Sequence, residues 1–291
     1  MSQREDFIFY DLSKRTKSKD ISLFFPDWQG EHENVMILSP HDDDALLGAG
    51  YIIRAVQSFG GNVFITIFND GSTGYSELGL KDKIVEIRKE ETINAFEKIQ
   101  IPPKNIYRFE IPDFSGINYL GWKHINGKEG VFRKIVSNLR KLKITRLIIS
   151  NGYKEHLDHT AVFLSGTFDG VQAGDSISID WGVPIKIKSF LIYSVWGDFS
   201  PEDALIKGRK TIIRGNLAIS VFEEVERDIQ LSVKEFKSQS EIINYILNVR
   251  KERKMDNGKY LEVYQKINPR PRININPYKK LVNEIDKKDI K

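Results

Sequence analysis

The sequence predicts an α/β fold, in which a mostly parallel, Rossmann-like sheet carries helices on both faces and a C-terminal extension follows. Between about residues 34 and 200, short apolar runs alternate with longer segments whose apolar residues recur at helical spacing. Such alternation is typical of βαβ units. The short runs are apolar throughout rather than at every second residue, as expected for parallel strands that are buried on both faces.

Nine segments of the chain carry the signals for these elements. Apolar runs predict strands over five of them: 35–40, 63–68, 105–111, 146–150 and 188–196. Apolar residues at helical spacing predict helices over four others: 44–58, 82–99, 130–142 and 158–168. The first helix is expected to stop at Phe59-Gly60-Gly61, since glycine is favoured just past a helix C-terminus.

The pattern changes beyond about residue 185. The polar segment 223–250 is predicted to be a long helix, and the segment 269–280, PRPRININPYKK, is predicted to be irregular. We find no internal repeat and no clear linker, so we expect one domain. The domain has three parts: an N-terminal segment over 1–33, an α/β core over 34–200, and a C-terminal extension over 201–291. The extension is expected to pack on the same domain and to carry a basic tail from about residue 250.

Composition excludes several classes of protein. The chain has 291 residues, of which 40% are hydrophobic and 29% charged, so it is not a largely disordered or low-complexity chain. It has no cysteine, which excludes disulfide scaffolds, thiolate nucleophiles and iron–sulfur clusters. No stretch of 18 apolar residues occurs and the N-terminus does not read as a secretory signal. We therefore expect no transmembrane segment and a cytoplasmic protein.

The basic residues are concentrated near the C-terminus. From residue 250 onward there are 13 Lys and Arg against 6 Asp and Glu, a net charge of +7. Such a tail can bind nucleic acid or an anionic membrane surface. Here the basic residues are scattered among acidic residues, proline and asparagine, which favours a solvated tail. We expect no nucleic-acid partner.

The first predicted strand runs directly into Pro40-His41-Asp42-Asp43-Asp44. Adjacent carboxylates repel one another, so this arrangement needs compensation. A helix N-terminus supplies some, and the plain interpretation is an Asp-rich helix cap. A divalent cation would supply more. His41 and Asp44 lie three residues apart across a strand-to-helix turn, so both can reach one metal ion.

A second polar cluster, Glu155-His156-Leu157-Asp158-His159, follows the strand over 146–150 and opens a helix. Ligands of parallel sheets bind at the carboxyl ends of the strands, so both clusters belong to the edge where sites form. Three of the five histidines of the chain fall there; His32 and His124 are expected at the surface. Two histidines and one aspartate match catalytic zinc, which has three protein ligands and one open position.

The two clusters resemble the signatures of one enzyme family. PHDDDALLGAG resembles PHPDDEVLGxGG of the PIG-L/LmbE-like zinc deacetylases, and EHLDHTAV resembles their HPDHxAV. The segments around Arg88, Asp113 and KEFKSQ resemble weaker family motifs in the same order, so that the resemblance covers roughly residues 34–245. The sequence departs from the family at Asp42 and Leu157, where the family has proline, and at Ala45, where it has glutamate.

The resemblance implies a function for each matched residue. The metal ligands would be His41, Asp44 and His159, holding one Zn²⁺ per chain. Asp43 would act as general base, and a protonated His156 would stabilise the oxyanion. Two further residues would contact sugar hydroxyls of the substrate: Arg88 and Asp113.

The resemblance also implies a substrate class, an N-acetylglucosamine-type amino sugar or its conjugate. The residues alone imply only metal-assisted hydrolysis. One alternative is a mononuclear non-haem iron oxygenase, because two histidines and one carboxylate also form its metal site. Another is a non-catalytic carbohydrate-binding protein. A homo-oligomer is compatible with the sequence.

Two mutational expectations follow from these assignments. Asp42→Asn is expected to have a mild effect on zinc content and deacetylation rate, because that position matches a family proline and needs no proton chemistry. Every predicted ligand precedes residue 160, so truncation after about Asn248 is expected to alter solubility or substrate range without abolishing zinc binding.

Overall fold

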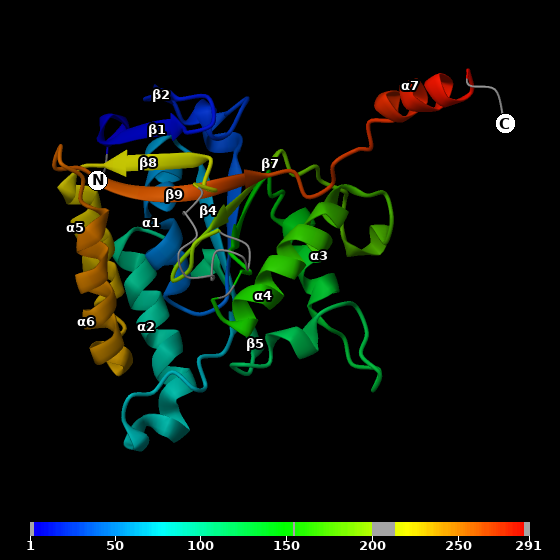
Figure 1. Ribbon diagram of the computed structural model, residues 1–291. Helices are drawn as coiled ribbons and strands as arrows, with labels where there is room; N and C mark the ends of the chain where they lie inside the picture. The colour runs from blue at the N-terminus through cyan, green and yellow to red at the C-terminus, as the bar shows by residue number, and fades with distance from the viewer. Residues whose placement is uncertain (1–2, 154, 200–212, 288–291) are drawn as a thin grey trace, which may run out of the picture.

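The computed structural model describes residues 3–153, 155–199 and 213–287. Among them, nine strands form one mixed sheet in the order β2-β1-β8-β9-β7-β6-β3-β4-β5 (Figure 1). The sheet is covered by helices on both faces, so the predicted fold class is confirmed. The predicted boundary near residue 200 and the last four residues lie outside the described part of the chain.

The parallel half of the sheet contains the five strands that the sequence predicts. In spatial order β7-β6-β3-β4-β5, each is hydrogen-bonded in parallel to its neighbour. Its central strand is wholly apolar between Val35 and Leu38, and these residues are buried on both faces. The strand bounds are β3 Asn34–Ser39, β4 Asn62–Asn69, β5 Ile106–Ile111, β6 Arg146–Ser150 and β7 Ser189–Tyr193.

The other half of the sheet is antiparallel and was not predicted. Strands from both ends of the chain lie side by side in it, because β1 pairs with β8, and β9 lies between β8 and β7. The expectation that the chain after about Asn248 can be removed without loss of metal binding does not fit this topology, since β9 is an internal strand. The bounds are β1 Phe7–Asp11, β2 Thr16–Ser18, β8 Leu217–Val221 and β9 Tyr260–Ile267.

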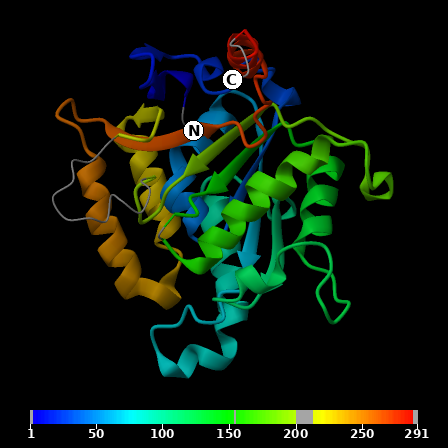
Figure 2. The ribbon, with the colours of Figure 1, turned by 45° about the vertical axis from the view of Figure 1, so that its right-hand side comes forward.

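Helices on the two faces bury two separate cores. Helices α1, α2, α5 and α6 cover one face, and α3 and α4 cover the other (Figures 1 and 2). On the first face, α5 of the C-terminal extension packs against both α1 and α2. The bounds are α1 Asp44–Ser58, α2 Ile84–Lys98, α3 Val131–Lys141, α4 Leu157–Leu164, α5 Glu223–Val233 and α6 Ser240–Val249.

Three helical predictions need correction. The segment 223–250 forms two helices, because the chain leaves α5 at Lys234 and passes through a short 3₁₀ turn before α6. Helix α4 ends at Leu164 and continues as a π-helical turn, Ser165–Asp169. The segment predicted as irregular contains the start of α7, Asn276–Ile285, which buries none of its residues and projects from the body (Figure 1).

The C-terminal extension also shapes the helix that carries the first polar cluster. Helix α1 is kinked at Ala49, whose φ of −130° is not helical. The groups freed by the kink are bonded by the extension, since Glu262 accepts from the N–H of Tyr51, and Arg250 and Arg253 donate to the carbonyl of Leu47. The direction of the first turn of α1 is therefore held by residues more than 200 positions away in the sequence.

Candidate metal centre

The two polar clusters meet at the carboxyl edge of the parallel strands. β3 ends at Ser39 and leads into α1, and β6 ends at Ser150 and leads into α4. These two strands are hydrogen-bonded neighbours with Leu38 opposite Ile149. The residues that follow them are therefore brought together, as the strand-end rule predicts.

His41, Asp44 and His159 form a candidate metal site. Asp44 Oδ2 lies 3.1 Å from His41 Nδ1 and 3.3 Å from His159 Nε2. One donor atom from each residue lies within 4.8 Å of the others, a spacing that can hold a metal ion. The side chains of Asp44 and His159 are 3% and 1% exposed, whereas that of His41 is 22% exposed, so the site opens on the His41 side. Two imidazoles and one carboxylate fit zinc with one position left open.

A buried carboxylate faces the second nitrogen of each histidine. Asp158 Oδ2 lies 3.3 Å from His41 Nε2, and its two oxygens accept the N–H groups of Phe114 and Gly116 at 2.7 and 2.8 Å. Glu155 Oε2 lies 2.5 Å from His159 Nδ1. Carboxylates in this position orient metal-bound histidines and fix which ring nitrogen carries the proton. A second group with metal-ligand spacing, His41, His156 and Asp158, overlaps the first.

The pKa values of the three candidate ligands are shifted in the directions that favour positive charge at this place: that of the aspartate is lowered and those of the histidines are raised. Burial raises the pKa of Asp44, but the adjacent His159 and His41 outweigh it and hold that pKa well below its usual value. Burial lowers the pKa of both histidines, and their carboxylate partners more than reverse this. The pKa of His159 rises to about 9 and that of His41 lies well above its usual value. A divalent cation at this place would substitute for those protons.

Asp43 precedes the ligand Asp44 and is 9% exposed. Burial raises the pKa of Asp43, Arg88 opposes this, and the charge of Asp44 adds to it, so that the pKa lies above the usual value. Arg88 Nη2 is 3.6 Å from Asp43 Oδ1. A carboxylate whose pKa is raised towards neutrality is a better general base than an ordinary one.

His156 lies beside the candidate ligands, with its ring centroid 5.2 Å from that of His41 and 4.3 Å from that of Phe114. Its Nδ1 accepts the N–H of Asp158 at 3.2 Å, so the proton of a neutral ring resides on Nε2. Burial and the neighbouring His41 lower the pKa of His156. Both observations favour a neutral ring that donates through Nε2, and the expected protonation of His156 in catalysis stays a prediction.

Asp42 occupies a buried charge cluster that the sequence did not predict. Its side chain is 0% exposed and contacts both Arg88 and Arg108. Thr92 Oγ1 donates to it at 2.7 Å. Two guanidinium groups thus compensate the carboxylate repulsion within the Asp42-Asp43-Asp44 run, in addition to the helix N-terminus. The three adjacent aspartates in the sequence indicated that their negative charge must be compensated. They did not indicate that Arg88 and Arg108 provide the positive charge.

The two predicted substrate contacts, Arg88 and Asp113, are bonded within the protein. Besides its aspartate partners, Arg88 donates through Nη1 to Gln239 at 2.6 Å, and its guanidinium lies 4.6 Å from the ring centroid of Phe236. Asp113 accepts the N–H groups of Gly71 and Thr73 and the Thr73 hydroxyl, at 3.1, 2.9 and 2.9 Å. Asp113 therefore fixes the loop after β4 at the rim of the site. Contact of either residue with a substrate stays a prediction.

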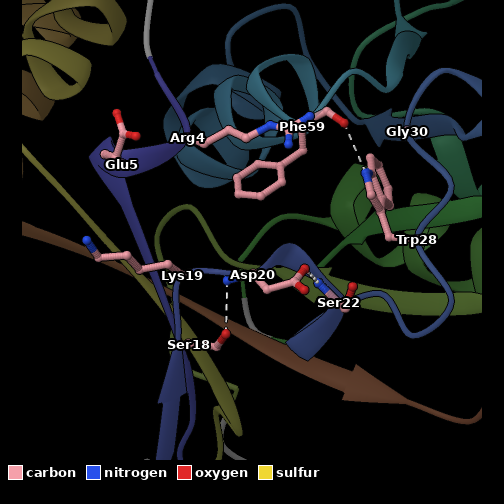
Figure 3. A pocket seen from close by; sticks show the side chains of 9 residues that line it. All are labelled: Arg4, Glu5, Ser18, Lys19, Asp20, Ser22, Trp28, Gly30 and Phe59. Atoms are coloured by element: carbon pink, nitrogen blue, oxygen red, sulfur yellow. Dashed lines mark hydrogen bonds between the residues drawn. The ribbon is translucent and has the colours of Figure 1, made fainter.

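A cavity of about 670 Å³ lies elsewhere in the molecule (Figure 3). It is found at the C-terminal end of α1, where Trp28 Nε1 donates to the carbonyl of Phe59 at 3.1 Å and Arg4 lies over the Phe59 ring. The candidate metal centre is at the other end of this 15-residue helix, about 20 Å away at 1.5 Å per residue. The cavity is therefore not part of the metal centre.

Comparisons with known proteins match both the sequence and the fold. The family model PIG-L, GlcNAc-PI de-N-acetylase, matches residues 36–167, which contain both polar clusters. No curated protein gives a significant sequence match. Among the described residues, no helix is both long and apolar enough to cross a membrane.

Several solved structures share the fold at low sequence identity. The N,N′-diacetylchitobiose deacetylase from Pyrococcus horikoshii is 16% identical with a TM-score of 0.65, and the match covers 86% of this chain and 88% of that one. The hydratase GalB from Pseudomonas putida is 14% identical with a TM-score of 0.59 (83% and 99% covered). A zinc-inhibited form of teicoplanin deacetylase is 17% identical with a TM-score of 0.54 (80% and 97% covered).

These relatives include both deacetylases and a hydratase, so the shared fold does not by itself choose the reaction. The sequence similarity to the PIG-L family model lies in the part of the chain that forms the carboxyl edge. The match over residues 36–167 includes the His41 and Asp44 cluster and the His159 cluster, and the structure brings these two clusters together. Over residues 36–167 the chain is therefore similar to the PIG-L family, GlcNAc-PI de-N-acetylase, and both clusters of the candidate metal centre lie in this matched part.

Proposed function

We propose that the protein is a zinc-dependent N-deacetylase that releases acetate from an N-acetylglucosamine-type amino sugar or its conjugate. The observation that carries this proposal is the convergence of His41, Asp44 and His159 on one point, with Asp43 and His156 beside them. A purely structural metal site needs neither a neighbouring carboxylate with a raised pKa nor a further imidazole. The family match supports deacetylation as the reaction.

A zinc ion at this site would lower the pKa of a bound water towards about 7 and polarise the acetyl carbonyl. The Asp43 carboxylate accepts a proton from the attacking water and passes one to the amine nitrogen as the C–N bond breaks. The N–H of His156 Nε2 donates to the carbonyl oxygen while negative charge develops on it. One water is consumed, and acetate and a free amine are formed.

The substrate class rests on the family and on the solved deacetylases that share the fold. The loop after β4, which Asp113 fixes, and the loop after β5, which Asp158 binds at Phe114 and Gly116, both lie at the same sheet edge. We propose that these two loops border the sugar, and that Arg88 and Asp113 act on it through the loop and through Asp43. For a direct contact with the sugar, Arg88 and Asp113 would each have to exchange a present hydrogen bond within the protein for one to the substrate.

The experiment is a screen of N-acetylated amino sugars with zinc-loaded protein, in which free amine and acetate are both measured. We expect equal amounts of amine and acetate with at least one substrate, and a release slower by roughly 10²- to 10⁴-fold with zinc-loaded Asp43→Asn. Zinc-loaded protein that releases no acetate would favour a carbohydrate-binding role. Oxygen consumption with Fe²⁺ would favour the oxygenase alternative, and hydration of an unsaturated acid would favour the reaction type of the hydratase that shares the fold.

A further inference from the structure

Glu155 joins two parts of the molecule that are far apart in the sequence. Its Oε1 accepts hydrogen bonds from the Ser194 hydroxyl at 2.5 Å and from three successive backbone N–H groups at 3.0 to 3.2 Å: those of Val195, Trp196 and Gly197. Its Oε2 lies 2.5 Å from Nδ1 of His159. The side chain is 0% exposed, so both contacts are shielded from water.

The segment 194–197 is shaped around this carboxylate. Three consecutive N–H groups converge on one oxygen and form an anion-binding nest, which the Glu155 carboxylate fills. The segment directly follows β7, which is the parallel neighbour of β6. It therefore lies at the same edge of the sheet as the candidate metal centre.

The other carboxylate oxygen acts on the metal ligand. Ser150 Oγ lies 2.9 Å from His159 Nδ1, but a hydroxyl can either donate to or accept from a ring nitrogen. An ionised carboxylate can only accept a hydrogen bond, so the nearby Glu155 favours a His159 ring that carries a proton on Nδ1. When a metal displaces the second proton of the ring, this tautomer leaves the lone pair of Nε2 available beside Asp44, whose Oδ2 lies 3.3 Å away. Glu155 Oε2 is a buried oxygen without a hydrogen-bond partner among the described residues, and its approach to His159 Nδ1 is an ion-pair contact.

We propose that Glu155 is a positioning residue that orients His159 for metal binding and at the same time fixes the segment 194–197 at the rim of the site. The inference rests on the proposed metal site and adds a coupling to it: the metal ligand and the rim segment share one carboxylate. Loss of this carboxylate therefore weakens metal binding and loosens the segment together.

The first test measures the zinc dissociation constant of Glu155→Gln by chelator competition. We expect zinc affinity to fall about 10- to 100-fold, the usual cost of removing a group that orients a ligand. Glu33→Gln is the matched control, because Glu33 is equally buried and bonded to Arg146, but precedes β3 at the opposite end of the strand. It should lose stability without loss of zinc affinity. Glu155→Gln that binds zinc within threefold of wild type would overturn the inference.

The second test uses Trp196, which is 50% exposed and lies in the segment itself. Its fluorescence is isolated by subtraction of the Trp196→Phe signal, and its accessibility is measured with acrylamide in metal-free protein. Glu155→Ala should increase the quenching of Trp196, and Glu33→Gln should not. Unchanged quenching in folded Glu155→Ala would show that the carboxylate does not hold the segment.

Ser194→Ala keeps the contact with His159 and removes one donor, so it tests the coupling even where Glu155 variants fold poorly. It should weaken zinc binding several-fold, and Glu155→Gln with Ser194→Ala should bind zinc no more weakly than Glu155→Gln alone, because Ser194 acts through Glu155. Additive losses would contradict the coupling. Wild-type protein that binds no zinc would instead refute the proposed metal site. Failure of the metal site can therefore be distinguished from failure of the role proposed for Glu155.

Discussion

Arg88 bridges two successive aspartates of the first polar cluster. Its Nε donates to Asp42 at 3.2 Å, and its Nη2 lies 3.6 Å from Asp43. The guanidinium is 2% exposed, so its charge is poorly screened by solvent. Arg88 thus compensates a buried carboxylate and, at the same time, restrains the rise in the pKa of the proposed general base.

Arg88→Met should therefore change both stability and the pH dependence of turnover. Breaking a buried ion pair by removing one partner costs about 3–5 kcal/mol, and urea unfolding would measure this loss. Without the guanidinium, the pKa of Asp43 should rise further, because the interaction that lowers it is gone. The acidic limb of the turnover–pH profile should shift to higher pH. A profile that keeps its acidic limb would argue that Asp43 is not the group that titrates.

Asp43→Asn and Asp44→Asn should separate proton transfer from metal binding. The two residues are adjacent and chemically identical, but only Asp44 has its carboxylate between His41 and His159. Asp43→Asn should keep about one zinc per chain while turnover falls roughly 10²- to 10⁴-fold. Asp44→Asn should lose zinc and recover part of its activity with excess metal. Zinc content and acetate release of the two purified variants decide this, and a fully active Asp43→Asn would refute the proposed base.

Asp42→Asn should be strongly destabilising, although the sequence predicts only a mild effect on zinc content and turnover. The side chain is fully buried between Arg88 and Arg108, and burial raises its pKa while the two guanidinium groups lower it below the usual value. An amide would leave two buried cations undercompensated, at a cost of about 3–5 kcal/mol. Thermal unfolding of metal-free protein isolates this effect from zinc binding. An unfolding free energy equal to that of wild type would show that the cluster contributes nothing.

Part of the fold and of the candidate site could be predicted from the sequence, and part could not. The parallel strands were predictable because strands such as 146–150 are apolar on both faces, and the metal ligands because they follow neighbouring strand ends. By contrast, β1 and β9 show the weaker alternation of half-buried strands, and nothing local indicates that the two ends of the chain share a sheet. The contacts of Glu155 with 194–197 and of Asp42 with Arg108 join residues 39 to 66 positions apart, so they depend on the folded chain.

Asp169, in the π-helical turn after α4, should make stability depend on pH. Burial raises its pKa from 3.8 to about 6, so the folded state binds this proton more tightly than the unfolded state does. Its contribution to stability is complete below about pH 4 and is lost as the pH rises to about 6. Asp169→Asn should therefore gain stability relative to wild type between pH 4 and pH 6. Unfolding curves across that range test this, with exposed Asp180→Asn as the control that should show no such gain.

Two truncations should show which part of the C-terminal extension the metal centre requires. A chain that ends at Asn248 lacks β9, an internal strand, and both arginines that bond the carbonyl of Leu47 at the α1 kink. It should fail to fold, because β7 and β8 lose their shared neighbour and the first turn of α1 loses its support. A chain that ends at Arg270 keeps all of these residues. It removes residues 271–291, and those that the structure describes, 271–287, are all exposed. It should keep wild-type zinc content and lose little stability. Circular dichroism and zinc content of the two chains are the measurements. A folded, zinc-binding chain that ends at Asn248 would show that the kink and β9 are not needed to place Asp44 beside His41 and His159.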